Sequence, residues 1–94
     1  MRAARRDANE DYLLRVAEQL GGFWVYAGPL DGWILHRGKW TPVEIKAPKG
    51  LLTQLQQRFM RDCETYGGPR YIWRTDEDVI KDLGGEWPRK YVLT

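Results

Sequence analysis

The sequence predicts a mixed α/β fold in which helices flank a central sheet, in the order α-β-β-β-α-β-α. Three observations favour this class. Two segments have helical periodicity and end at Gly-Gly pairs, residues 21–22 and 67–68. Four short segments rich in aromatic and β-branched residues lie between turn signals. The chain has 94 residues, 43% hydrophobic and 30% charged, which suits one globular domain with its core over about residues 7–83.

The first helix is expected between about residues 7 and 20, where apolar side chains recur at i, i+3, i+4 and i+7. This inner stripe consists of Leu13, Val16, Ala17 and Leu20. Glu10 lies on the same stripe, three residues before its first leucine.

Three strands are expected next, "FWVYAG", "GWILH" and "KWTPVEIKA". Gly28 and Pro29 end the first strand, and the other two form a hairpin across Arg37 and Gly38. Pro42 lacks a backbone N–H, so we expect the early part of the third strand to be an edge or a bulge.

The second helix is expected in "KGLLTQLQQRFMRDCETYGG", where Thr53 is the N-cap and Gln56 completes a capping box. Its predicted inner stripe consists of Leu55, Phe59, Cys63 and Tyr66. A last strand, "RYIWR", precedes a short acidic helix from a Thr75 cap, with Asp78 at the box position, to about Leu83. The tail at 84–94 is ambiguous, a further strand being one interpretation.

Composition excludes several function classes. One cysteine, Cys63, cannot form an internal disulfide, and one His with one Cys cannot build a zinc site of those ligands. The apolar runs are shorter than a membrane span, so we expect an intracellular protein with no membrane partner. The net charge is +2, with basic residues at the start and around the hairpin and acids in "TDEDVIKDLGGE". This distribution suits an anion on one face, although ordinary solvated charge explains it as well.

Three polar residues stand in the hairpin region where apolar ones are expected: Asp31, Glu44 and Lys46. Alternation along the third strand puts Glu44 and Lys46 on one face. If the turn at residues 37–38 has two residues, the register places Asp31 opposite Glu44, with the side chains on a shared face.

Two facing carboxylates repel unless something neutralises them, and a hard divalent cation does so well. Such a cation and a nearby lysine suit phosphodiester hydrolysis. Asp with Glu-x-Lys is a weak pattern alone, because it arises by chance on solvated strands.

Further segments strengthen the pattern: "GG", "GPLDGW", "VEIKA", "LTQLQQRF", "YGG" and "YIWRTDEDV", in this order from about residue 10 to 83. The chain resembles the PD-(D/E)xK nuclease superfamily, and within it the small stand-alone VRR-NUC type related to Holliday-junction resolvases. The resemblance implies a restriction-endonuclease-like core. Two departures are visible: Pro29 lies one residue further than usual from Asp31, and no Val-Arg-Arg triplet is present, the nearest string being "IWR".

The resemblance also implies residue roles. Asp31 and Glu44, with the main-chain carbonyl of Ile45, would bind Mg²⁺ or Mn²⁺, and Lys46 would be the catalytic lysine. Gln56 would orient the site, and the first-helix acid, Glu10, would contact the metal or its water. Capping competes with both of these last roles: the Thr53 capping box explains the glutamine, and an N-cap at residue 7 would explain the acid.

The function that follows is a homodimeric, metal-dependent endonuclease that hydrolyses DNA phosphodiester bonds, with branched, flap or four-way junction DNA as substrate. Arg37, Lys39 and Lys49 are candidate DNA contacts. Trp33 and Trp40 share the predicted face of Asp31, where they would stack on unpaired bases or pack in a core or dimer contact. Three alternatives stay open: a non-catalytic nucleic-acid-binding module, a nuclease subunit active only within a larger assembly, and a structural subunit.

Overall fold

The computed structural model describes residues 9–84, which form a four-stranded mixed sheet and flanking helices. The elements are α1 (Glu10–Gln19), β1 (Phe23–Val25), β2 (Gly32–His36), β3 (Lys39–Ile45), α2 (Gln54–Thr65), β4 (Tyr71–Trp73), α3 (Asp76–Val79) and a π-helical turn (Ile80–Gly84). The predicted class and element order are therefore confirmed. The tail at 84–94, for which a further strand was one interpretation, lies outside the described residues except for Gly84.

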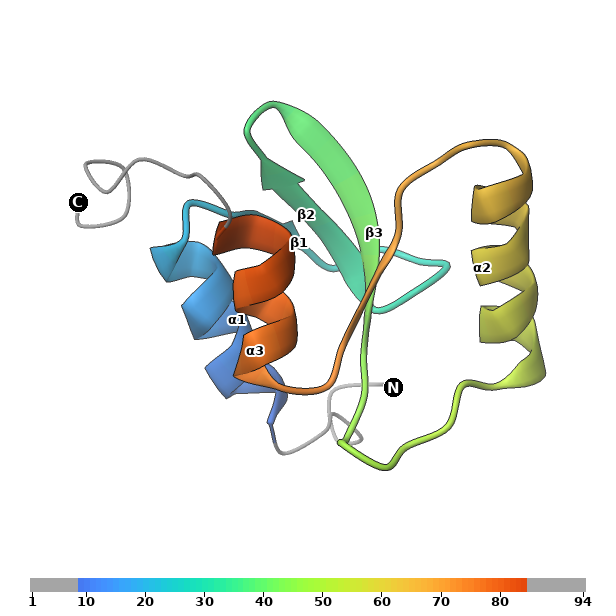
Figure 1. Cartoon of the computed structure of the whole chain (residues 1–94), viewed down its shortest axis with the longest axis horizontal. Helices are drawn as coiled ribbons and strands as arrows, with labels where there is room; N and C mark the ends of the chain where they lie inside the picture. The colour runs from blue at the N-terminus through green and yellow to red at the C-terminus, as the bar shows by residue number, and fades with distance from the viewer. Residues whose placement is uncertain (1–8, 85–94) are drawn as a thin grey trace.

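The sheet order is β1-β2-β3-β4, with β1, β2 and β3 antiparallel and β4 parallel to β3. Parallel neighbours need a long crossover, and the segment containing α2 supplies it. Helices α1 and α3 lie together on one side of the sheet, whereas α2 lies on the other side (Figure 1). The core fills the α1–α3 side and consists of Leu13, Ala17, Ile34, Val43, Ile45, Trp73, Val79 and Leu83.

The apolar stripe of α1 is confirmed, since Leu13 and Ala17 are buried and Val16 packs against the core. The helix begins at Glu10, with Asn9 as its N-cap, so the expected start was placed three residues too early. The residue proposed as its alternative cap, at position 7, lies outside the described residues. Gly21 ends the helix with a φ of 93°, a conformation that glycine adopts without steric strain.

The β2–β3 hairpin turns over two residues, Arg37 (φ 55°) and Gly38 (φ 79°), and His36 pairs with Lys39 as predicted. Pro42 lies on the part of β3 that precedes the pairing with β4, which begins at residue 43. Its missing N–H faces the side on which no strand yet lies, so the expected edge position is confirmed.

The inner stripe predicted for α2 is wrong at both of its ends. Leu55 and Tyr66 are 78% and 86% exposed, and the buried side chain is Met60. The inward face of the helix consists instead of Gln56, Phe59, Met60 and Cys63. The side-chain amide of Gln56 on this face donates to the Glu44 carboxylate on the sheet.

A capping box at Thr75 and Asp78 begins α3, as predicted. The Asp78 carboxylate also accepts the N–H of Arg74 (2.8 Å), which fixes the exit from β4. The buried Trp73 indole N–H donates to Asp82 at 3.0 Å. Within residues 9–84, no helix has the length and apolar character needed to cross a membrane.

Candidate metal-binding site

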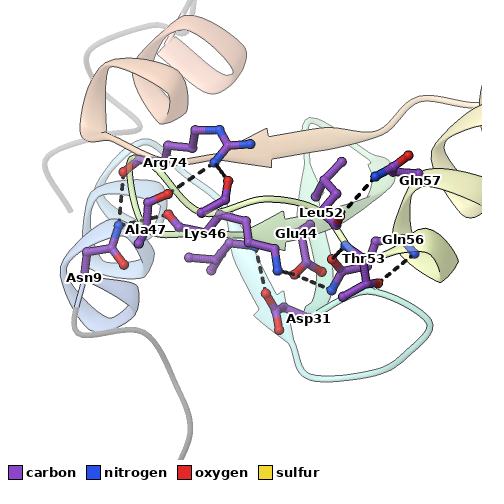
Figure 2. Close-up of polar contacts among 12 residues, drawn as sticks. Asn9, Asp31, Glu44, Lys46, Ala47, Leu52, Thr53, Gln56, Gln57 and Arg74 are labelled. Carbon is purple, nitrogen blue, oxygen red and sulfur yellow. Dashed lines mark hydrogen bonds and ion pairs between the residues drawn. The ribbon is translucent and has the colours of Figure 1, made fainter.

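The end of β3 and the start of β2 bring two acids together. The pairing of Gly32 with Val43 is the last of the β2–β3 register, and it aligns the preceding residue, Asp31, with the following one, Glu44. Figure 2 shows the side chains of Asp31, Glu44 and Lys46 converging beside Gln56 of α2. The register deduced from the two-residue turn is thereby confirmed.

Asp31 is 8% exposed, and its Oδ2 accepts the backbone N–H of Ile45 at 2.8 Å. The indole N–H of Trp33 donates to the carbonyl of Gly28 (3.0 Å), which holds the loop before Asp31 against β2. In a strand the N–H and C=O of one residue point to the same edge, so the Ile45 carbonyl also lies on the Asp31 side of β3. The resemblance implies that this carbonyl is a metal ligand, and its orientation is compatible with that role.

Glu44 is the most deeply buried member of the site, at 3% exposure, and its two carboxylate oxygens differ. Oε2 accepts the side-chain amide of Gln56 at 2.8 Å and lies 3.6 Å from the Lys46 ammonium. Oε1 is buried, and it has no hydrogen-bond partner among the described residues. A buried carboxylate oxygen without a donor is unfavourable and invites a ligand.

Burial raises the pKa of Glu44 to about 7, and the neighbouring Asp31 carboxylate contributes to the rise. The Lys46 ammonium opposes these effects but only partly offsets them. At neutral pH the pair therefore carries less than two full negative charges. A divalent cation would favour the ionised form of Glu44 and return the pair to two charges.

Gln56 makes the contacts expected for both of its predicted roles, the capping box and the orientation of the acid pair. Its Oε1 accepts the backbone N–H of Thr53 (2.9 Å) in the capping box, and its Nε2 donates to Glu44. The cap defines which end of the amide is oxygen, so the donor must face the carboxylate. The start of α2 thus positions the Glu44 side chain on the sheet.

The donor set fits a hard cation of the Mg²⁺ type. Such ions commonly use one or two protein carboxylates, with water and substrate phosphate completing the shell. Asp31 and Glu44 are two carboxylates, one with an unsatisfied oxygen. Across residues 9–84, no group of three or more His, Cys, Asp or Glu side chains could hold a metal ion.

Among the described residues, Glu10 forms no three-carboxylate group with Asp31 and Glu44, and its direct contact with the metal stays a prediction. It is buried at the start of α1, as its stripe position indicated, and it accepts a hydrogen bond from the Tyr26 hydroxyl at 3.2 Å. A contact with a metal-bound water stays a prediction.

Two contributors were missed by the sequence interpretation. Arg74, at the end of β4, donates to the carbonyls of Ala47 (3.2 Å) and Gly50 and so holds the loop that follows Lys46. Asn9 donates to the carbonyls of Lys46 (3.3 Å) and Arg74 (3.0 Å). Figure 2 shows these contacts beside the acid pair. Their only local signal is the N-cap position of Asn9, because the contacts themselves span distant segments.

The three predicted DNA contacts lie in two places. Lys49 is exposed in the loop after the site, whereas Arg37 and Lys39 are exposed at the hairpin turn. Lys39 is five residues from Glu44 along β3, or about 17 Å.

His36 is half-buried at the hairpin end of β2, and its ring donates to the Leu20 carbonyl (3.2 Å). Burial lowers the pKa of this histidine.

Comparison of the chain with protein-family models, with curated proteins and with solved structures finds no match.

Proposed function

We propose that the protein is a metal-dependent nuclease that hydrolyses phosphodiester bonds in DNA. One observation carries the proposal: two buried carboxylates and a lysine converge, and one buried oxygen of Glu44 lacks a donor among the described residues. A purely structural ion pair would be expected to satisfy both oxygens. The resemblance to PD-(D/E)xK nucleases supports the same function.

Asp31 and Glu44, with the Ile45 carbonyl, would hold the cation. When bound, Mg²⁺ or Mn²⁺ polarises a phosphoryl oxygen and lowers the pKa of coordinated water. The Lys46 ammonium can donate to a phosphate oxygen and stabilise the charge that develops there. Gln56 holds Oε2 of Glu44 and leaves the other carboxylate oxygen to the cation.

Cleavage of plasmid, linear, flap and four-way junction DNA tests the proposal. The wild-type chain should cut at least one substrate in Mg²⁺ or Mn²⁺ and none in EDTA. Lys46→Ala should reduce the rate by about 10²–10³-fold, as expected for loss of a donor to developing charge. Lys81→Ala, which removes the same charge from an exposed position in the π-helical turn, is the matched control and should cut normally.

Equal cleavage by the wild type and Lys46→Ala would assign the activity to a contaminant. DNA binding in EDTA without cleavage in either metal would favour the non-catalytic binding module. A wild-type chain that neither binds nor cuts DNA would refute both nucleic-acid functions.

A further inference from the structure

The sheet face that carries Asp31 and Glu44 continues away from them as an apolar surface. Strand alternation and register place the buried Pro42 on this part of β1–β3, together with five further side chains. We call these five the exposed sheet face: Phe23, Val25, Trp33, Leu35 and Trp40. Phe23 and Trp40 are 60% and 45% exposed, and their rings meet edge to face with centroids 6.4 Å apart.

The exposed sheet face is continuous with the acid pair. Trp33 lies two residues from Asp31 along β2, and Trp40 lies four residues from Glu44 along β3. These separations correspond to about 7 Å and about 13 Å. A nucleic acid strand with one phosphate at the acid pair could therefore lay its neighbouring nucleotides on these rings.

The charges at the two ends of the exposed sheet face suit a polyanion. Arg37 and Lys39 are exposed at the hairpin turn, and Lys49 is exposed in the loop beyond the acid pair. Apart from Glu44 of the acid pair, the described residues of β1, β2 and β3 place no acid on this face. Cationic ends with aromatic rings between them are the elements that bind single strands of nucleic acid.

We propose that the exposed sheet face binds unpaired bases, so that the substrate carries a single-stranded segment beside the scissile phosphate. The inference rests on the proposed function, whose substrate it specifies. Aromatic rings stack on any base, because every base has a π-face, so binding should be tolerant of sequence. Paired bases in a duplex do not present those faces.

Fluorescence anisotropy with a short, labelled oligothymidylate in EDTA tests this proposal without cleavage. Trp40→Ala and Phe23→Ala should each weaken binding by about 5- to 150-fold, the range for loss of one stacked base. Trp40→Phe, which retains a ring, should recover most of the affinity. Tyr12→Ala removes an exposed aromatic ring from α1, on the opposite side of the sheet, and should bind like the wild type.

Unchanged affinity in Trp40→Ala, or an equal loss in Tyr12→Ala, would overturn the proposal. A third result would also overturn it: in sedimentation velocity the wild type is a dimer and Trp40→Ala a monomer, while both bind oligothymidylate equally. The exposed sheet face would then be a subunit contact. The two proposals fail separately. Oligothymidylate binding that depends on Trp40, with no metal-dependent cleavage, would refute the nuclease alone, and cleavage with ring-independent binding would refute the base-binding face alone.

Discussion

The two faces of the sheet are built in opposite ways. Under α1 and α3 the residues are apolar and buried, as Val43 and Trp73 illustrate, and the packing is closed. Under α2 the sheet buries two acids, Asp31 and Glu44, while Phe23 and Trp40 are exposed. The first arrangement stabilises a fold, whereas the second leaves Oε1 of Glu44 buried without a donor among the described residues. If the proposed function is correct, stability and activity depend on different faces of the sheet.

The largest effect on the closed face should come from Trp73→Ala. The side chain is fully buried, and its indole donates to Asp82, so truncation leaves both a cavity and an unpaired carboxylate. We expect the free energy of unfolding to fall by about 3–5 kcal/mol, measured by urea denaturation. A loss below about 1 kcal/mol would contradict the assignment of this face as the core.

The pH dependence of stability should identify the acid face. The pKa of Glu44 is raised from 4.5 to about 7 in the folded chain, so its contribution to stability is complete below about pH 4.5. As the pH rises through about 7 that contribution is lost, and the free energy of unfolding falls by about 3 kcal/mol at most. Urea denaturation of the metal-free chain between about pH 5 and 8 should show this loss in the wild type.

Glu44→Gln is the variant that isolates this effect, because it removes the titrating group and keeps the shape. His36 acts in the opposite direction: burial lowers its pKa, so its contribution is lost as the pH falls below about 6.5. Only the difference between the wild type and Glu44→Gln therefore reports on Glu44. Parallel pH profiles of the free energy of unfolding for the two proteins would show that the pKa of Glu44 is not raised by folding.

Gln56 links α2 to the acid face, and two substitutions separate its roles. Gln56→Glu can still accept the Thr53 N–H, but it replaces the donor to Glu44 by a carboxylate. It should keep most of the stability while lowering Mn²⁺-dependent cleavage. Gln56→Ala should also lose the cap, and its free energy of unfolding, measured by urea denaturation, should fall by about 1 kcal/mol. Full cleavage activity in Gln56→Glu would mean that the amide does not position Glu44.

The smallest effect should come from Leu55→Ala. A leucine at i, i+4 with Phe59 resembles a core residue in sequence, yet it is largely exposed on α2. We expect a change within about 0.5 kcal/mol by urea denaturation, as for other surface positions. A loss above about 2 kcal/mol would mean that this helix face is packed in solution.

These cases show what the sequence could predict. Strand alternation and a two-residue turn sufficed to place Asp31 opposite Glu44, because both rules are local. The capping boxes of α2 and α3 were readable for the same reason. The rotation of α2 was not, since periodicity identifies an apolar stripe without revealing which face of a helix the rest of the protein will cover.

The contacts of Arg74 with Ala47 and Gly50 mark a second limit. They join the end of β4 to a loop more than twenty residues earlier, and no spacing rule predicts such a contact. The partners are backbone carbonyls, so the loop sequence carries no complementary signal. Asn9 is similar: its position before α1 suggests a cap, but its amide instead donates to the carbonyls of Lys46 and Arg74.

Calorimetric titration of Mn²⁺ into the chain at neutral pH, without DNA, tests the central claim most directly. The wild type should bind one or two ions with proton release, because binding ionises Glu44. Glu44→Gln should lose the proton release and most of the affinity, whereas Glu18→Gln should match the wild type. Equal Mn²⁺ binding by the wild type and Glu44→Gln would contradict a cation site between Asp31 and Glu44.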